Sequence, residues 1–223
     1  MADPTIANGP FLGSSRNPFS YEKVEQISRD VQTSWLTLDE VTQQLNLFQD
    51  DSQADYLYGL ELATRMAIED YLGMPIFPIQ WKAYYGSNGA TGTAITLDLP
   101  EVSQDDVEQG TKGVTIDEVG FWSYGVQPTY NVLNPDQYAY DPSGNKVIVN
   151  GIPNMVSQII TNPISVIYTT QASPIAQYPV IKLAALLLLT HLYNNRSNTV
   201  QGSLNQIPFG VDTLLRPYKP LVM

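Results

Sequence analysis

The chain has 223 residues, 43% of them hydrophobic, which suffices for one compact core and a smaller subdomain. It has no cysteine, which excludes disulfides, thiolate metal sites and cysteine nucleophiles. Asp and Glu number 22 against 11 Lys and Arg, a formal net charge of -11. The cations are scattered singly, so we expect neither tight nor sequence-specific DNA binding.

Residues 1–34 are expected to form an N-terminal arm. Its first 19 residues hold three prolines and two glycines among small residues, which favours an extended segment ordered only by a neighbour. Further on, the spacing of Tyr21, Val24, Ile27 and Val31 predicts a short amphipathic helix.

A well-marked helix start follows the arm. Thr37 stands three residues before Glu40, the spacing of a capping box, and Leu36 and Val41 are placed to pack across the start as a hydrophobic staple. These features predict a helix over residues 38–45.

The clearest helix is predicted over residues 53–72, ending at Gly73 before a proline. Its inward positions follow helical spacing and are Leu57, Leu60, Thr64, Ala67, Ile68 and Tyr71. Of these, we expect Leu57, Leu60, Ile68 and Tyr71 in the core. Another edge of the helix carries Glu61, Arg65 and Glu69 at four-residue spacing, typical of an exposed ion-pair row.

Between residues 74 and 170 the apolar pattern changes to the alternation of β-strands. Strands are predicted at 79–85, 95–99, 136–140, 146–149 and 164–169, and residues 141–145 form a hairpin turn. The acidic stretch 101–118 is expected to be a protruding loop. Four aromatic residues are assigned to the core of these strands: Trp81, Trp122, Tyr138 and Tyr140.

A second long helix is predicted from Pro179 to Asn194, with Leu188 and Leu192 in the core. It is apolar nearly all round, so we expect it to be buried on several sides by its own fold or by another subunit. Its longest apolar run, Leu183 to Leu189, is far shorter than the roughly 20 residues of a membrane-spanning helix, and we expect no membrane partner.

Together these elements predict an α+β fold. A small helical bundle contains an antiparallel β subdomain inserted between its two long helices, and extended arms stand at both ends. The expected segments are the arm at 1–34, helices at 35–73, the β subdomain at 74–170, the core helix and its loop at 171–203, and a C-terminal arm at 204–223.

The sequence offers little for catalysis. His191 is the only histidine and lies within the apolar helix, where a structural role is favoured over catalysis or metal binding. Asp105, Asp106 and Glu108 fit a solvated acidic loop better than a calcium loop, and the glycine-rich stretch 86–92 lacks the P-loop lysine. Facing carboxylates for glycoside hydrolysis cannot be placed from sequence. We therefore expect no enzyme, catalytic residue, metal or cofactor.

The order of the segments resembles the head-tail connector (adaptor) family of tailed bacteriophages. The resemblance runs over residues 35–217 and rests on several short motifs taken in order. They are Trp35 to Val41, Asp50-Asp51, Glu69 to Gly73, Tyr138 to Gly144, Val166 to Thr169, Pro179 to Lys182, His191 to Arg196, and Ile207 to Leu215.

The resemblance implies a structural virion protein of the neck, assembled in the host cytoplasm. Such a subunit forms a homo-oligomeric ring, usually of twelve copies, below the portal protein, and is a platform for the next neck or tail protein. DNA passes through the ring without sequence-specific binding. In this family the C-terminal segment reaches toward the portal.

Apolar and cationic residues of this C-terminal segment are the expected contacts with the portal or a neighbouring subunit. They are Ile207, Phe209, Leu214, Leu215, Arg216, Tyr218, Lys219 and Leu221. Pro217 to Pro220 are expected to stay extended. The alternative is that the segment folds back onto its own helices.

Two other functions remain open at this point. A different neck or tail-completion protein, such as a stopper or terminator, would share the composition and the β region. A carbohydrate-binding or hydrolytic β protein would instead need carboxylates and aromatic residues converging on one concave face.

Overall fold

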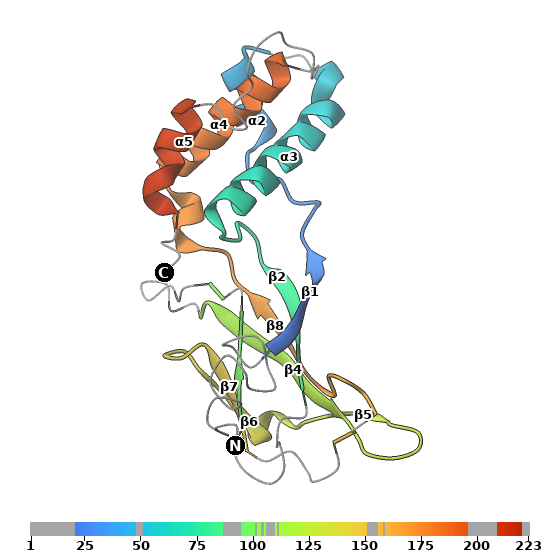
Figure 1. Ribbon diagram of the computed structural model, residues 1–223. Helices are drawn as coiled ribbons and strands as arrows, with labels where there is room; N and C mark the ends of the chain where they lie inside the picture. The colour runs from blue at the N-terminus through green and yellow to red at the C-terminus, as the bar shows by residue number, and fades with distance from the viewer. Residues whose placement is uncertain are drawn as a thin grey trace, which may run out of the picture. The chain divides into compact units, whose positions relative to one another are not determined.

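The computed structural model describes residues 21–47, 51–86, 95–100, 102, 103, 105, 110, 112–150, 156, 157, 159–195 and 209–219. The chain divides into two compact units. The β unit comprises Met1–Arg29 and Ile79–Gln171, and the helical unit comprises Asp30–Pro78 and Ala172–Met223. The fold class is α+β, as predicted, and the strands β2 to β8 lie in the sequence between the two long helices (Figure 1).

Helices α3 and α4 lie side by side in the helical unit, and α5 packs on α4 (Figure 1). The elements of this unit are α2 (Leu38–Leu45), η1 (Asp51–Gln53), α3 (Ala54–Leu72), η3 (Pro174–Gln177), α4 (Pro179–Asn194), α5 (Phe209–Leu215) and η4 (Arg216–Tyr218). None of the helices in the described ranges has both the length and the apolar character needed to cross a bilayer.

The ends of the first two helices follow the sequence signals. Thr37 Oγ1 accepts a hydrogen bond from Glu40 N at 3.2 Å, and Glu40 Oε2 accepts one from Thr37 N at 2.8 Å, which is the predicted capping box. Helix α3 ends at Gly73, whose φ of 64° lies in the left-handed region that glycine adopts without strain.

Apolar side chains of all four helices form the core of the helical unit. Among the predicted core residues, Leu57, Ile68 and Leu188 are buried. The other three, which are Leu60, Tyr71 and Leu192, are half-buried and pack against this core. Ala67, predicted on the same face, is exposed.

The β unit contains two antiparallel sheets whose inner side chains share one core. The larger sheet has the order β1-β2-β8-β4-β5, and the smaller one has the order β3-β7-β6. Their strands are β1 (Tyr21–Arg29), β2 (Ile79–Tyr85), β3 (Ile95–Asp98), β4 (Val114–Trp122), β5 (Tyr130–Val132), β6 (Tyr138–Asp141), β7 (Lys146–Val149) and β8 (Ile164–Thr170). The predicted hairpin is β6–β7, and its turn uses Asn145 with a φ of 50°.

The segment predicted as a short helix near the N-terminus is strand β1 instead. It pairs with β2, and its register shifts between Tyr21 and Lys23 and again between Gln26 and Ser28. The first shift puts both Tyr21 and Val24 against the core at a spacing of three residues. That spacing imitates a helix, which is why the apolar pattern was misleading.

Two loop predictions are also corrected. The end of the predicted acidic loop belongs to β4, which begins at Val114 and pairs with β8 inside the larger sheet. A register shift between Ile116 and Glu118 breaks its alternation and hides it from a period-two search. Near the C-terminus, Pro217 and Tyr218 are not extended but belong to the 3-10 turn η4 (Arg216–Tyr218), whereas Lys219 is extended as predicted. Pro217 lies early in the turn, where its ring is tolerated.

Candidate assembly surfaces

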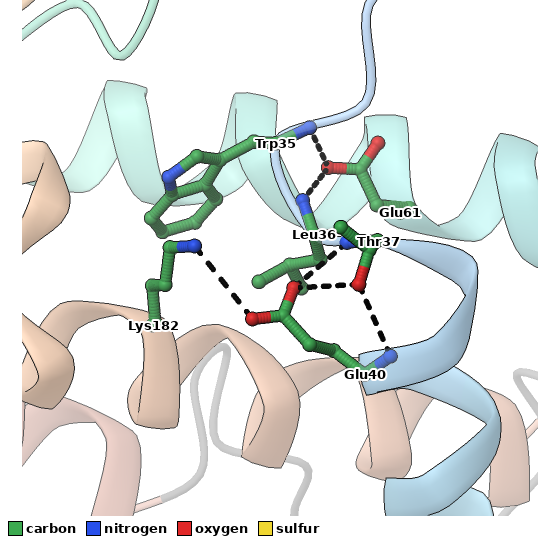
Figure 2. A network of polar contacts seen from close by, with 6 residues as sticks. All are labelled: Trp35, Leu36, Thr37, Glu40, Glu61 and Lys182. Carbon is green, nitrogen blue, oxygen red and sulfur yellow. Dashed lines mark hydrogen bonds and ion pairs between the residues drawn. The ribbon is translucent and has the colours of Figure 1, made fainter.

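Three charged residues of α3 are buried, although their spacing predicted an exposed ion-pair row. Glu61 lies under the segment that leads into α2, and its Oε1 accepts hydrogen bonds from Trp35 N at 3.0 Å and Leu36 N at 3.1 Å (Figure 2). Burial raises the pKa of Glu61, and these two N–H groups offset only part of that effect.

Arg65 and Glu69 continue the same row along α3. Arg65 is 0% exposed, and its Nη1 donates to Thr33 O at 2.6 Å while its Nη2 donates to Asp30 O. Its guanidinium also lies 4.7 Å from the ring centre of Phe77. Glu69 Oε1 accepts a hydrogen bond from Ile76 N at 2.7 Å.

The prediction of exposed ion pairs is therefore wrong, because backbone groups of the two flanking segments are the partners of these charges. Residues 30–36 and 76–77 are fixed on α3 by this charged row.

Helix α2 is also fixed to α4. Lys182 Nζ lies 3.7 Å from Glu40 Oε1 (Figure 2). Gln44 Nε2 donates to Thr190 Oγ1 at 3.2 Å. The backbone N–H of Thr37 is the main cause that lowers the pKa of Glu40. Helix α2 therefore packs on one side of α4.

Another side of α4 is apolar and open. Leu183 is 47% exposed and Leu187 is 38% exposed, and the two stand one helical turn apart on the same face. We name this pair the leucine strip. The sequence indicates that α4 is too apolar to face solvent on all sides. The described helices of its own unit nevertheless leave these two leucines uncovered.

A concave surface lies where α2 begins beside α3. It has a volume of about 180 Å³ and is lined mainly by apolar side chains. We name it the α2–α3 socket, and the lining residues that matter below are Leu36, Leu38, Val41, Leu57, Tyr58 and Glu61. Leu38 and Tyr58 are both exposed at its opening.

The C-terminal residues that the sequence assigns to partner contacts lie in different surroundings. Leu215 is buried in the core of the helical unit, while Leu214 and Tyr218 are half-buried against it. Arg216 and Lys219 are exposed.

Tyr71 ties this segment to α3. Its hydroxyl donates to Asp212 Oδ1 at 2.5 Å, which raises the pKa of Tyr71, and Lys219 Nζ lies 4.8 Å from the centre of its ring. The helical end of the chain therefore packs on its own unit as far as Lys219. Ile207, Leu221 and the side chain of Phe209 lie outside the described residues.

Exposed apolar side chains also occur in the β unit, near the β4–β5 connection. They are Tyr124, Val126, Val132 and Ile159. On the outer face of the larger sheet, Tyr130 lies against Gly120 and donates to Glu118 Oε1 at 2.7 Å. Residues with both apolar area and hydrogen-bonding groups are common in protein interfaces.

The residues considered for chemistry are not brought together. His191 Nδ1 lies 3.3 Å from Asn195 Nδ2 at the end of α4. Asp105 Oδ1 accepts a hydrogen bond from Gly113 N at 2.5 Å, and Asp106 and Glu108 lie outside the described residues. Within the described ranges no group of three or more His, Asp or Glu side chains could hold a metal ion.

The α+β fold, with a β insertion between two long helices, is similar to that of chains of known structure. No family model matches this chain. No curated protein sequence matches it either. A similar chain comes from the neck of an empty gene transfer agent particle with C6 symmetry, at a TM-score of 0.57 and 18% identity.

Two further similar chains come from the same kind of particle. One is from the virion of a native gene transfer agent particle, at a TM-score of 0.52 and 15% identity. The other is from the neck of a native particle with C12 symmetry, at a TM-score of 0.52 and 17% identity. Each of the three alignments covers 91% of this chain and 97% of the other chain. At these identities the likeness establishes a common fold.

Proposed function

We propose that this chain is a structural neck protein of a tailed-phage-like particle, and specifically a head-tail connector subunit. The observation that carries the proposal is the likeness in fold to neck chains over nearly the whole length of both proteins. The C12 symmetry of one of those necks suits a ring of twelve copies around a DNA passage.

The physical character of the chain agrees with this role. The leucine strip and the apolar surface near β5 are areas that an assembled particle would cover. The net charge of -11 favours a conduit that lets DNA slide past without gripping it. Under this proposal the ring stands between the portal and the next neck or tail protein.

We further propose that the C-terminal segment contacts the portal or a neighbouring subunit. Its exposed cations Arg216 and Lys219 and the half-buried Leu214 and Tyr218 are available for such a contact. Leu215 supports it from within the core and offers no surface of its own. The cations would pair with acidic groups at a solvent-exposed rim, where each pair adds about 1 kcal/mol or less.

Depletion and complementation test this proposal. Without the chain, we expect DNA-filled heads that do not join tails, because the platform below the portal is missing. The full chain should restore joined particles, and a chain lacking residues 217–223 should fold but restore few of them. The folded state is checked by circular dichroism.

Two outcomes would contradict the proposal. If depleted cells still produce joined particles, the neck role is wrong. If heads and tails join normally with the shortened chain, the C-terminal contact is wrong while the neck role stands.

A further inference from the structure

We infer that the leucine strip of one copy binds in the α2–α3 socket of the next copy, an inference that rests on the proposed ring. Successive helical units then join head to tail. The partner at each end is a second copy of this chain, and both surfaces belong to the helical unit alone.

The leucine strip needs a cover that the described helices of its own unit do not supply. On α4, one side packs into the core through Ile181, Ala185 and Leu188, while Leu183 and Leu187 stay open. Removing apolar surface from water gains about 25 cal/mol of free energy per Å². Covering the exposed parts of these two leucines would therefore favour association with a partner. Helix α4 contains no Asp or Glu, so no carboxylate has to be desolvated on that helix.

The socket has the size and lining to receive such side chains. Its volume of about 180 Å³ is well above the roughly 10–15 Å³ that a cavity needs to hold one water molecule. Its apolar wall includes Leu36, Val41 and Leu57. The Oε1 atom of Glu61, a residue that borders the socket, already accepts hydrogen bonds from Trp35 N and Leu36 N.

The exposed charges near the socket are acidic, whereas those of η4 and the residue after it are cationic. The sequence has no Lys or Arg between Asp30 and Thr64, and Asp39 and Asp55 are exposed beside the socket. On the α4 side, η4 lies next to the start of α4, where the rings of Tyr178 and Tyr218 are 5.9 Å apart. Arg216 in η4 and Lys219 just after it are exposed cations of the same helical unit.

The contact is heterologous, because its two halves come from different elements. The strip belongs to α4, whereas the described lining of the socket comes from residues 34–41 and from α3. Heterologous contacts repeat from copy to copy and close into a ring when the rotation fits. A contact between two leucine strips would instead be two-fold and would stop at a dimer.

Cysteine cross-linking tests this directly, because the natural chain has no cysteine. Leu187→Cys and Tyr58→Cys are made separately and mixed at high concentration under mild oxidation. We expect a disulfide-linked dimer with one copy of each variant, and little dimer from either variant alone. A chain with both substitutions should give a ladder of covalent oligomers.

Matched variants serve as controls. Ala67→Cys places an exposed cysteine on α3 away from the socket, and with Leu187→Cys it should give only background cross-linking. Leu183→Cys with Leu38→Cys is a second test pair, so a single poorly folded variant does not decide the result. Both positions of this pair are exposed in the folded chain.

The inference is overturned if Leu187→Cys links mainly to itself, or if no strip–socket pair exceeds the Ala67→Cys background. Its failure is distinct from failure of the proposed function. If cross-linking stays at background while the chain is found in particle necks, only this contact is rejected. If the doubly substituted chain forms a covalent ladder but the chain is not found in particle necks, only the neck role is rejected.

Discussion

Replacing Arg65 by Met should destabilise the helical unit by about 1–3 kcal/mol, the range expected when hydrogen-bond acceptors lose a charged donor. Methionine retains the apolar stem but cannot donate. The carbonyls of Asp30 and Thr33 then lose their donors, and Glu61 loses a nearby cation that favours its charged form. The measurement is urea unfolding followed by circular dichroism at the helical signal.

Arg216→Met is the matched control, because the same chemical change falls on an exposed cation of the same unit. Its free energy of unfolding should change by less than about 0.5 kcal/mol. Equal losses in the two variants would mean that the buried contacts of Arg65 do not stabilise the fold.

Leu188→Ala should cost about 2–5 kcal/mol, because it removes buried side-chain atoms and leaves a cavity between α4 and its neighbours. Leu188 is 5% exposed and belongs to the core of the helical unit. The same unfolding measurement applies. A melting temperature equal to that of the natural chain would refute the assignment of this side of α4 to the core.

Leu183→Ala is the comparison on the same helix. With 47% of Leu183 exposed, its loss should cost less than about 1 kcal/mol in the isolated chain. It should nevertheless weaken association between copies, because the leucine strip is proposed to be a contact surface. The two leucines thus separate folding from assembly.

Local signals made the helices predictable. The capping box of Thr37 and Glu40 and the stop at Gly73 need only neighbouring residues, so they can be recognised in a sequence. Strand β1 could not be recognised in the same way, because its first register shift puts Tyr21 and Val24 on one face. A bulge in β4 hides that strand for the same reason.

The candidate surfaces were only partly predictable. The sequence indicates that α4 is too apolar for solvent, yet which leucines stay exposed depends on where α2, α3 and α5 pack. The burial of Glu61, Arg65 and Glu69 was missed because their partners are backbone groups of segments up to 35 residues away in the chain. Side-chain spacing on one helix carries no signal for such partners.

A cryo-EM map of the particle neck would show whether this chain forms a ring there. We expect a ring of this fold, with twelve copies, around an open channel between the portal and the next component. Density for this chain elsewhere in the particle, or only as a single copy, would contradict it. A ring farther down the neck would identify a stopper or terminator instead of a connector.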